Sequence, residues 1–245
     1  MYGATGDAST PAAPAAPVDL SVASAVRLSL VVGVAAAALG LAPAVGTAWA
    51  LARGRFRGKS LLAALVMVPL VLPPVVTGLL VLQLLGRSTL LGGLLATLGL
   101  PVTFTLLGAV VAALVVGFPV YVMTIRGAFE AIDPRYEEVS LSLGQAPRAT
   151  FRRVTLPLAL PGIAAGVVLA FARGLGEFGA TAIVAGNMEG QTRTIALAVY
   201  ALLDSPGEDP RVAYLAAASV ALSLAALVAF EAMNRWQRRR LALDG

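Results

Sequence analysis

The sequence contains no cysteine and no histidine, and its only lysine is Lys59. These absences exclude disulfides, thiolate nucleophiles, cysteine or histidine metal sites and imidazole acid–base catalysis. Charged residues make up only 13% of the chain. An enzyme built from this sequence would therefore have to work with hydroxyl groups, carboxylates and arginines alone.

Hydrophobic residues are abundant instead. They make up 58% of the 245 residues, and the mean hydropathy is +0.86. A soluble domain of this length could not bury so much apolar surface, which predicts an all-α membrane protein. The formal net charge of +5 does not indicate nucleic-acid binding, because the basic residues gather at the ends of apolar runs, as topology signals do.

The apolar runs predict about five transmembrane helices in a single membrane domain that covers residues 21–240. The expected spans are approximately 24–51, 61–85, 102–125, 158–184 and 212–233. A shorter apolar stretch within 192–205 cannot cross about 30 Å of hydrocarbon and suits a re-entrant or interfacial helix. Residues 1–20 are rich in alanine and proline, which predicts a disordered extracytoplasmic tail.

Three basic clusters set the expected orientation. The first follows span one at 53–59, the second comprises five arginines within 126–157, and the third comprises four arginines at 235–240. Short loops rich in arginine and lysine stay in the cytoplasm. Five spans with the amino end outside place all three clusters in the cytoplasm, whereas a sixth span would place one of them outside.

Two adjacent prolines, Pro73 and Pro74, lie inside the second expected span. Each lacks a backbone N–H and frees a carbonyl in the preceding turn, which lipid cannot satisfy. This part of the helix is therefore expected to face protein or an aqueous translocation path. A packing kink with no role in translocation explains the same prolines equally well, so both interpretations stay open.

Arg173 and Glu177 lie one helical turn apart inside the fourth expected span. A charged side chain at the centre of a membrane helix costs about 2.5–3.5 kcal/mol on insertion scales, so it normally faces the bundle interior and has a partner. The two side chains either form an ion pair that locks the span or lie beside the path of a permeating ion. Their spacing is compatible with both interpretations.

The longest charged segment, residues 126–157, separates the third and fourth expected spans and contains several helix signals. Asp133 is a good N-cap, Pro134 fits the first helical position, and Gly144 fits the left-handed residue that ends a helix. Pro147 can open a second short helix that ends before the fourth span. The segment therefore predicts two short helices joined by a Gly144 elbow on the membrane surface, where a partner can dock.

The same segment resembles the EAA loop of bacterial ABC-importer permeases. Glu138-Val139-Ser140 is followed by Gly144 six positions after Glu138, and Val154-x-Leu156-Pro157 begins ten positions after Gly144. In that family the loop is a coupling helix that inserts into a groove on a cytoplasmic ATPase. The resemblance implies that these residues couple the chain to such an ATPase: Glu137, Glu138, Val139, Ser140, Gly144, Leu156 and Pro157. The chain departs from the family at Val139 and Ser140, where alanines are usual, and this affects the fine geometry of docking.

Three further motifs narrow the resemblance to molybdate-import permeases of the sulfate/molybdate type. They are Leu72-Pro73-Pro74-Val75-Val76, the segment 171–181 and Gly190-Gln191-Thr192-Arg193-Thr194-Ile195. The match extends over most of the chain, from about Arg53 to Glu231. It implies a type I ABC importer permease fold in a bacterial plasma membrane, and import of molybdate and tungstate by alternating access. It also implies a homodimer, two cytoplasmic ABC ATPase subunits that bind ATP and Mg²⁺, and an extracytoplasmic oxyanion-binding protein.

The chain itself is not expected to hydrolyse ATP or to hold a cofactor. The segment 54–60 resembles a phosphate-binding loop, but it is one residue short and follows a membrane helix instead of a strand. Two other functions stay open. One is transport of sulfate, thiosulfate or phosphate by a permease of the same superfamily. The other is a non-transport role as a membrane scaffold or an intramembrane serine enzyme, which the missing histidine and the loop position of Lys59 disfavour.

Overall fold

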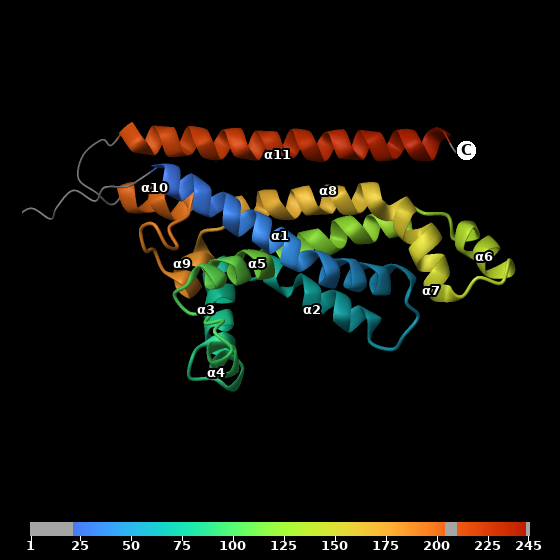
Figure 1. The fold of residues 1–245 in the computed structure, drawn as a ribbon, viewed down its shortest axis with the longest axis horizontal. Coiled ribbons are helices and arrows are strands. Elements are labelled where there is room, and N and C mark those ends of the chain that lie inside the picture. Colours follow the sequence, from blue (N-terminus) through green and yellow to red (C-terminus); the bar gives the residue numbers. More distant parts are fainter. Residues whose placement is uncertain (1–21, 204–209, 244–245) are drawn as a thin grey trace, which may run out of the picture.

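The computed structural model describes residues 22–203 and 210–243, and every regular element within these ranges is a helix. Most of the helices run along one long axis, with α3 standing across it (Figure 1). In chain order the elements are α1 Val22–Arg53, α2 Lys59–Val71, α3 Pro74–Leu85, α4 Leu90–Thr97, α5 Leu106–Glu130, α6 Pro134–Ser142, α7 Pro147–Thr150, the π turn η1 Phe151–Thr155, α8 Leu156–Leu175, α9 Gly179–Ala185, α10 Ile195–Leu203 and α11 Pro210–Leu243. The tail expected at 1–20 lies outside the described residues.

Four helical stretches in the described ranges are long and apolar enough to cross a membrane. They are α1, α5, the continuous stretch Pro147–Leu175 and Arg211–Met233 within α11. The α2–α3 pair is a fifth candidate if its two bent helices are counted as one span. The structure therefore confirms an all-α membrane protein with about five spans.

The core lies where α1, α5 and α8 pack against one another. Small residues let bulky α5 side chains enter the interface, and Tyr121, Ile125 and Phe129 are almost completely buried. A Cβ atom at Gly166 of α8 would lie 2.8 Å from Ile125 Cγ1, so only glycine allows this approach. The Tyr121 hydroxyl donates to the Ala37 carbonyl of α1 at 3.2 Å. These contacts hold the three helices together.

The second expected span is broken. The sequence predicts one helix over 61–85, whereas α2 ends at Val71, α3 begins at Pro74, and the two axes are bent by 116°. Leu72 and Pro73 have ψ values of 143° and 134°, outside the helical region. A proline disfavours the α conformation of the residue before it, and here two consecutive prolines act on two consecutive residues. The adjacent prolines therefore produce a sharp corner.

The fourth expected span differs at both ends. It ends at Leu175 instead of 184, and a short irregular stretch separates it from α9. At its start, the second short helix does not stop before the span, because α7 continues through η1 into α8. Pro157 has no N–H for the preceding turn and its ring crowds a carbonyl there, and the chain widens into a π turn just before it.

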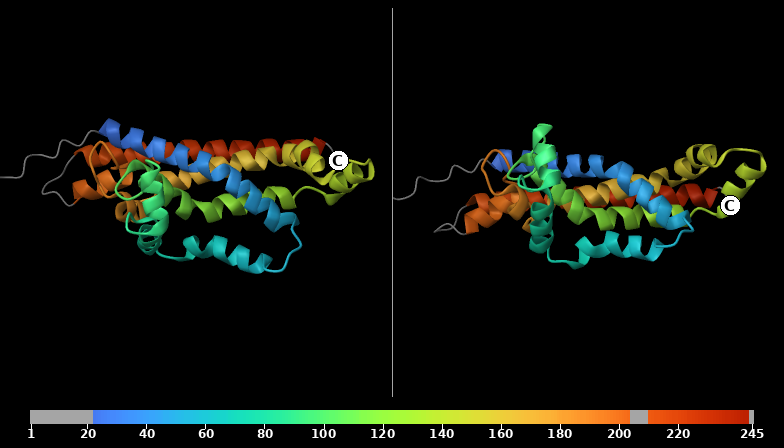
Figure 2. Two further views of the ribbon diagram at one scale, coloured as in Figure 1. Left: turned by 60° about the horizontal axis from the view of Figure 1, so that its bottom comes forward. Right: turned by 90° about the horizontal axis from the view of Figure 1, so that it is seen from below.

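The two ends of the bundle carry different elements. α6 and α7 lie at one end, and α3, α4, α9 and α10 gather towards the other (Figures 1 and 2). α10 lies within the stretch 192–205 that is too short to cross a membrane, and Ala25, Leu202 and Leu215 pack together where it meets α1 and α11. The Ile195 N–H donates to Ser29 Oγ at 2.8 Å, which fixes α10 to α1.

Candidate functional site

The helix α6 is shaped by its own sequence. The Asp133 carboxylate accepts a hydrogen bond from the Arg135 N–H at 2.9 Å, and Pro134 occupies the first turn. Gly144 has φ of +81°, and the Gln145 N–H reaches back to the Ser140 carbonyl at 3.2 Å. This left-handed glycine turns the chain towards α7. The expected elbow therefore lies at Gly144.

Glu137 attaches α6 to the bundle. Its Oε1 atom accepts hydrogen bonds from Arg53 Nε at 3.2 Å and from Thr155 Oγ1 at 2.9 Å. Arg53 also donates through Nη2 to the Ile132 carbonyl at 2.7 Å, just before α6 begins. The end of α1 and the π turn therefore both donate hydrogen bonds to the Glu137 carboxylate. The sequence predicts Glu137 among the residues that contact an ATPase, whereas the structure places it on the inner face of α6.

A second buried contact joins α6 to α7. The hydroxyls of Ser140 and Thr150 lie 2.9 Å apart, and the two side chains are 8% and 4% exposed. Ser140 is one of the two departures from the alanines of the EAA pattern, and Thr150 supplies its partner. This hydrogen bond sets the distance between the two short helices on either side of the Gly144 elbow.

The face of α6 that points away from Glu137 is apolar and exposed. Tyr136, Val139 and Leu143 are 47%, 59% and 78% exposed, and they recur at helical spacing. Together with Ser140 and Val154 they border an open hollow of about 540 Å³. Exposed apolar residues gathered around a hollow at one end of a molecule mark an interaction site. Glu138 is exposed on the same helix.

The remaining coupling candidates lie apart from this face. Leu156 and Pro157 are in the first turn of α8, and Leu156 packs against the main core. Of the seven residues, the structure brings Val139 and Ser140 together at the hollow, with Glu138 exposed beside them. Gly144 shapes the elbow.

The two helix breaks meet on the other side of the core. A Cβ atom at Gly179 of α9 would lie 3.1 Å from Pro74 Cβ, and one at Gly78 of α3 would lie 2.7 Å from Ala180 Cα. The corner at Pro73 and Pro74 therefore packs directly on α9. Gly78 leaves no room for a Cβ atom because it lies directly against the backbone of Ala180, and Gly179 is closely packed against Pro74.

Arg173 and Glu177 form the ion pair that their spacing permits. Arg173 Nη1 donates to Glu177 Oε2 at 3.1 Å, and the Glu177 side chain is only 2% exposed. Glu177 Oε1 also accepts from the Ala180 N–H at 2.8 Å, so this carboxylate caps α9. The Arg173 side chain remains 31% exposed. The pair therefore lies at the break between α8 and α9 and not within a continuous helix.

Sequence reasoning missed three residues that hold α6 in place: Arg53, Thr150 and Thr155. Arg53 counts only as a topology signal in the sequence, because nothing local shows which carboxylate it meets 84 positions away. The motif that ends in Ile195 was recognised from the sequence as a family resemblance, but its contacts were not: Arg193 donates to the Asn187 side chain at 2.8 Å and to its carbonyl at 3.2 Å. Within the described ranges no group of three or more acidic side chains is arranged to hold a metal ion.

Comparisons with known proteins agree with this architecture. The chain is 42% identical to the molybdenum transport system permease protein ModB of Haemophilus influenzae, over 89% of this chain and 96% of that one. It is 38% identical to the sulfate transport system permease protein CysT of Salmonella typhimurium, over 78% of this chain and 68% of that one. A solved bacterial alginate ABC transporter, in complex with its pentasaccharide-bound periplasmic protein, shares the fold. Its TM-score is 0.64 at 19% identity, and the match covers 89% of this chain and 78% of that chain.

The match to a protein family extends over residues 28–243, which include every candidate residue described above. The broken helices, the elbow at Gly144 and the exposed face of α6 all fall inside it. The chain therefore belongs to the family of binding-protein-dependent transport system inner membrane components.

Proposed function

We propose that this chain is the membrane-spanning subunit of an ABC importer that carries molybdate, and tungstate with it, into a bacterial cell. The observation that carries the coupling role is the uncovered apolar face of α6, held rigidly by Glu137 and by the Ser140–Thr150 contact. The similarity to the Haemophilus molybdenum permease over nearly the full length of both chains supports the substrate.

The working assembly has two copies of this chain, two cytoplasmic ATPase subunits and an extracytoplasmic oxyanion-binding protein. ATP and Mg²⁺ bind the ATPase, and this chain holds neither a cofactor nor a catalytic site of its own. The amino end lies outside, and α6 with the carboxyl end lies in the cytoplasm. The basic cluster that includes Arg53 supports this orientation because it lies at the α6 end.

A doubly charged tetrahedral oxyanion needs such a machine. Removing its hydration shell in a low-dielectric medium costs tens of kcal/mol, so it cannot cross hydrocarbon unaided. In the proposed cycle the ATPases close on ATP and draw the two α6 helices together, which opens the bundle outward. Nucleotide release returns the bundle to the inward state. The permease is the element with two states, and α6 is where the ATPase biases it.

The translocation path runs beside the two helix breaks. Pro73 and Pro74 form the break between α2 and α3. Glu177 caps α9 at the break that follows α8, and its partner Arg173 is partly exposed there. An arginine held by a buried carboxylate attracts an anion without binding it deeply, because the ion pair neutralises most of its charge. That arrangement suits passage, since a strong cationic trap would slow release.

A sulfate permease is the second candidate, because the chain is 38% identical to the Salmonella sulfate permease. One experiment separates the two. Molybdenum, tungsten and sulfur accumulation is measured at trace oxyanion in cells that lack the gene and in cells where it is restored, with and without excess sulfate. Rescue of molybdenum accumulation despite sulfate is expected. A fall in sulfur accumulation with molybdenum unchanged would assign the chain to sulfate instead.

A further inference from the structure

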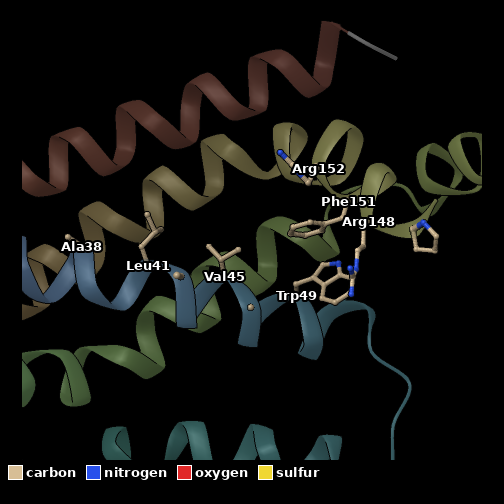
Figure 3. Close-up of a pocket in the computed structure, with 10 residues that line it drawn as sticks. Ala38, Leu41, Val45, Trp49, Arg148, Phe151 and Arg152 are labelled. Carbon is tan, nitrogen blue, oxygen red and sulfur yellow. The ribbon is translucent and has the colours of Figure 1, made fainter. Parts of the chain in front are cut away.

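An apolar groove runs along α1 on the side of α7 and η1. It is an open hollow of about 780 Å³, and its walls include Leu41, Val45 and Trp49 from α1 and Arg148, Phe151 and Arg152 from the facing segment (Figure 3). We name it the α1 groove. We propose that the α1 groove binds one anionic phospholipid, with an acyl chain along α1 and the phosphate against Arg148 and Arg152.

The length of the groove along α1 fits one leaflet. Ala38, Leu41, Val45 and Trp49 follow one another along α1, and Arg148 lies at the Trp49 end (Figure 3). Ala38 and Trp49 are eleven positions apart, which is about 16 Å along a helix and close to half of a hydrocarbon core about 30 Å thick. The apolar part therefore extends from the membrane centre to the interface.

The Trp49 end lies at the level of the headgroups. Tryptophan is enriched at membrane–water interfaces, and Arg53, one turn further along α1, begins the basic cluster that marks the aqueous side. The Trp49 ring is 42% exposed and packs edge-on against Phe151, with 5.2 Å between the ring centroids. The two packed rings form an apolar surface against which a glycerol backbone would lie.

The charges at this end select an anion. No carboxylate lines the groove, and among the described residues neither Arg148 nor Arg152 has a hydrogen-bond or ion-pair partner for its guanidinium. Arginine forks match phosphate oxygens geometrically. The Arg148 side chain lies beside Trp49, whereas the Arg152 side chain points away from it (Figure 3), so one headgroup at Arg148 would contact both guanidinium groups once the exposed Arg152 side chain turns towards it. Arg153 differs because it donates to Gln145 at 3.2 Å and does not line the groove.

The test uses quenching of Trp49 fluorescence by lipids brominated on their acyl chains. The chain has two tryptophans, so the full-length protein carrying Trp236→Phe reports on Trp49 alone. It is reconstituted in phosphatidylcholine that contains a small fixed fraction of either brominated phosphatidylglycerol or brominated phosphatidylcholine. Stronger quenching by the phosphatidylglycerol is expected. Each of Arg148→Gln and Arg152→Gln should lower the preference roughly five-fold, which corresponds to about 1 kcal/mol per basic residue.

Two variants guard the interpretation. Arg153→Gln removes the same charge from the same segment outside the groove and should leave the preference intact. Gly46→Phe fills the groove without touching either arginine, because a Cβ at Gly46 meets no atom within 4 Å, and it should abolish the preference. Equal quenching by the two lipids, or a preference that survives Gly46→Phe, would overturn the proposal. So would a Trp49 that neither lipid quenches while Gly46→Cys forms disulfide-linked dimers, because a second copy would then cover the groove.

Discussion

Arg53 Nε lies 3.2 Å from Glu137 Oε1, and this ion pair joins the last residue of α1 to the first turn of α6. The two side chains are 19% and 21% exposed, so the pair is shielded from solvent on most sides. The carboxylate is also held by Thr155. The contact therefore links a membrane-spanning helix directly to the helix that the ATPase is proposed to move.

The Arg53–Glu137 pair should contribute more to stability than an exposed surface ion pair does. A double-mutant cycle with Arg53→Ala and Glu137→Ala, followed by thermal unfolding in detergent, should give a coupling energy of about 1 kcal/mol. The Arg126–Glu130 pair is a matched control because it is an i,i+4 pair with side chains 30% and 46% exposed. Its coupling energy should stay at roughly 0.3–0.5 kcal/mol. Equal values for the two pairs would remove the special role of Arg53.

The Ser140–Thr150 contact should behave as a buried pair of hydroxyls. Ser140→Ala or Thr150→Val alone leaves one buried hydroxyl without a partner and should cost about 1–2 kcal/mol of unfolding free energy. The double variant should recover part of this loss, because no unpaired donor remains. Additive losses in the double variant would show that the two hydroxyls do not depend on each other.

Gly144→Ala should impair coupling while the protein still inserts into the membrane. Gly144 has φ of +81°, and an alanine there costs roughly 1–2 kcal/mol because its Cβ approaches the following carbonyl. Gly127→Ala is the control, since both sites have open space for a Cβ but Gly127 lies within helix α5. It should stabilise the protein by up to about 1 kcal/mol. Substrate uptake is the readout, and normal uptake with Gly144→Ala would contradict the coupling role of the elbow.

The exposed face of α6 should hold the ATPase. Leu143→Asp places a charge on the hollow beside Tyr136 and Val139 and should reduce co-purification of the ATPase at least ten-fold, about 1.4 kcal/mol of binding free energy. Leu141→Asp is the matched control, because Leu141 is 45% exposed on the same helix but does not border the hollow. A similar loss with both variants would point to unfolding of α6 and not to a lost contact.

The Arg173–Glu177 pair should show the penalty of an isolated buried charge. Arg173→Ala leaves a carboxylate that is 2% exposed without its cation, and should destabilise the protein by about 3–5 kcal/mol. Adding Glu177→Gln removes that charge but keeps an oxygen that can accept from the Ala180 N–H. The double variant should therefore be more stable than the single one in thermal unfolding. The reverse order would mean that the carboxylate does not depend on Arg173.

The sequence predicts α6 well because its ends depend on local chemistry. Asp133, Pro134 and Gly144 each act on neighbouring backbone groups, so their effect can be predicted without the rest of the fold. The fold class follows from composition for a similar reason, since lipid restricts a chain of this hydropathy to helices once a closed barrel is excluded.

The positions of the helix breaks could not be predicted from local sequence. Pro43, Pro119 and Pro161 lie inside continuous helices, whereas Pro73 and Pro74 form a corner of 116°. The difference depends on two prolines acting in succession and on α9 packing against the corner, which only the tertiary structure shows. The end of α8 depends likewise on the hydrogen bond that the Ala180 N–H donates to the Glu177 carboxylate. The inward position of Glu137 depends on where α1 ends.

Two contacts along α1 are separated by a fixed length of helix. Ser29 receives the Ile195 N–H near one end, and Arg53 holds Glu137 at the other, 24 positions and about 36 Å further along the same helix. Inserting one residue between them would rotate one end by about 100° relative to the other and lengthen the helix by about 1.5 Å. One of the two contacts would then be lost. The number of residues between Ser29 and Arg53 is therefore constrained by both contacts, and an insertion or deletion inside this stretch is expected to break one of them.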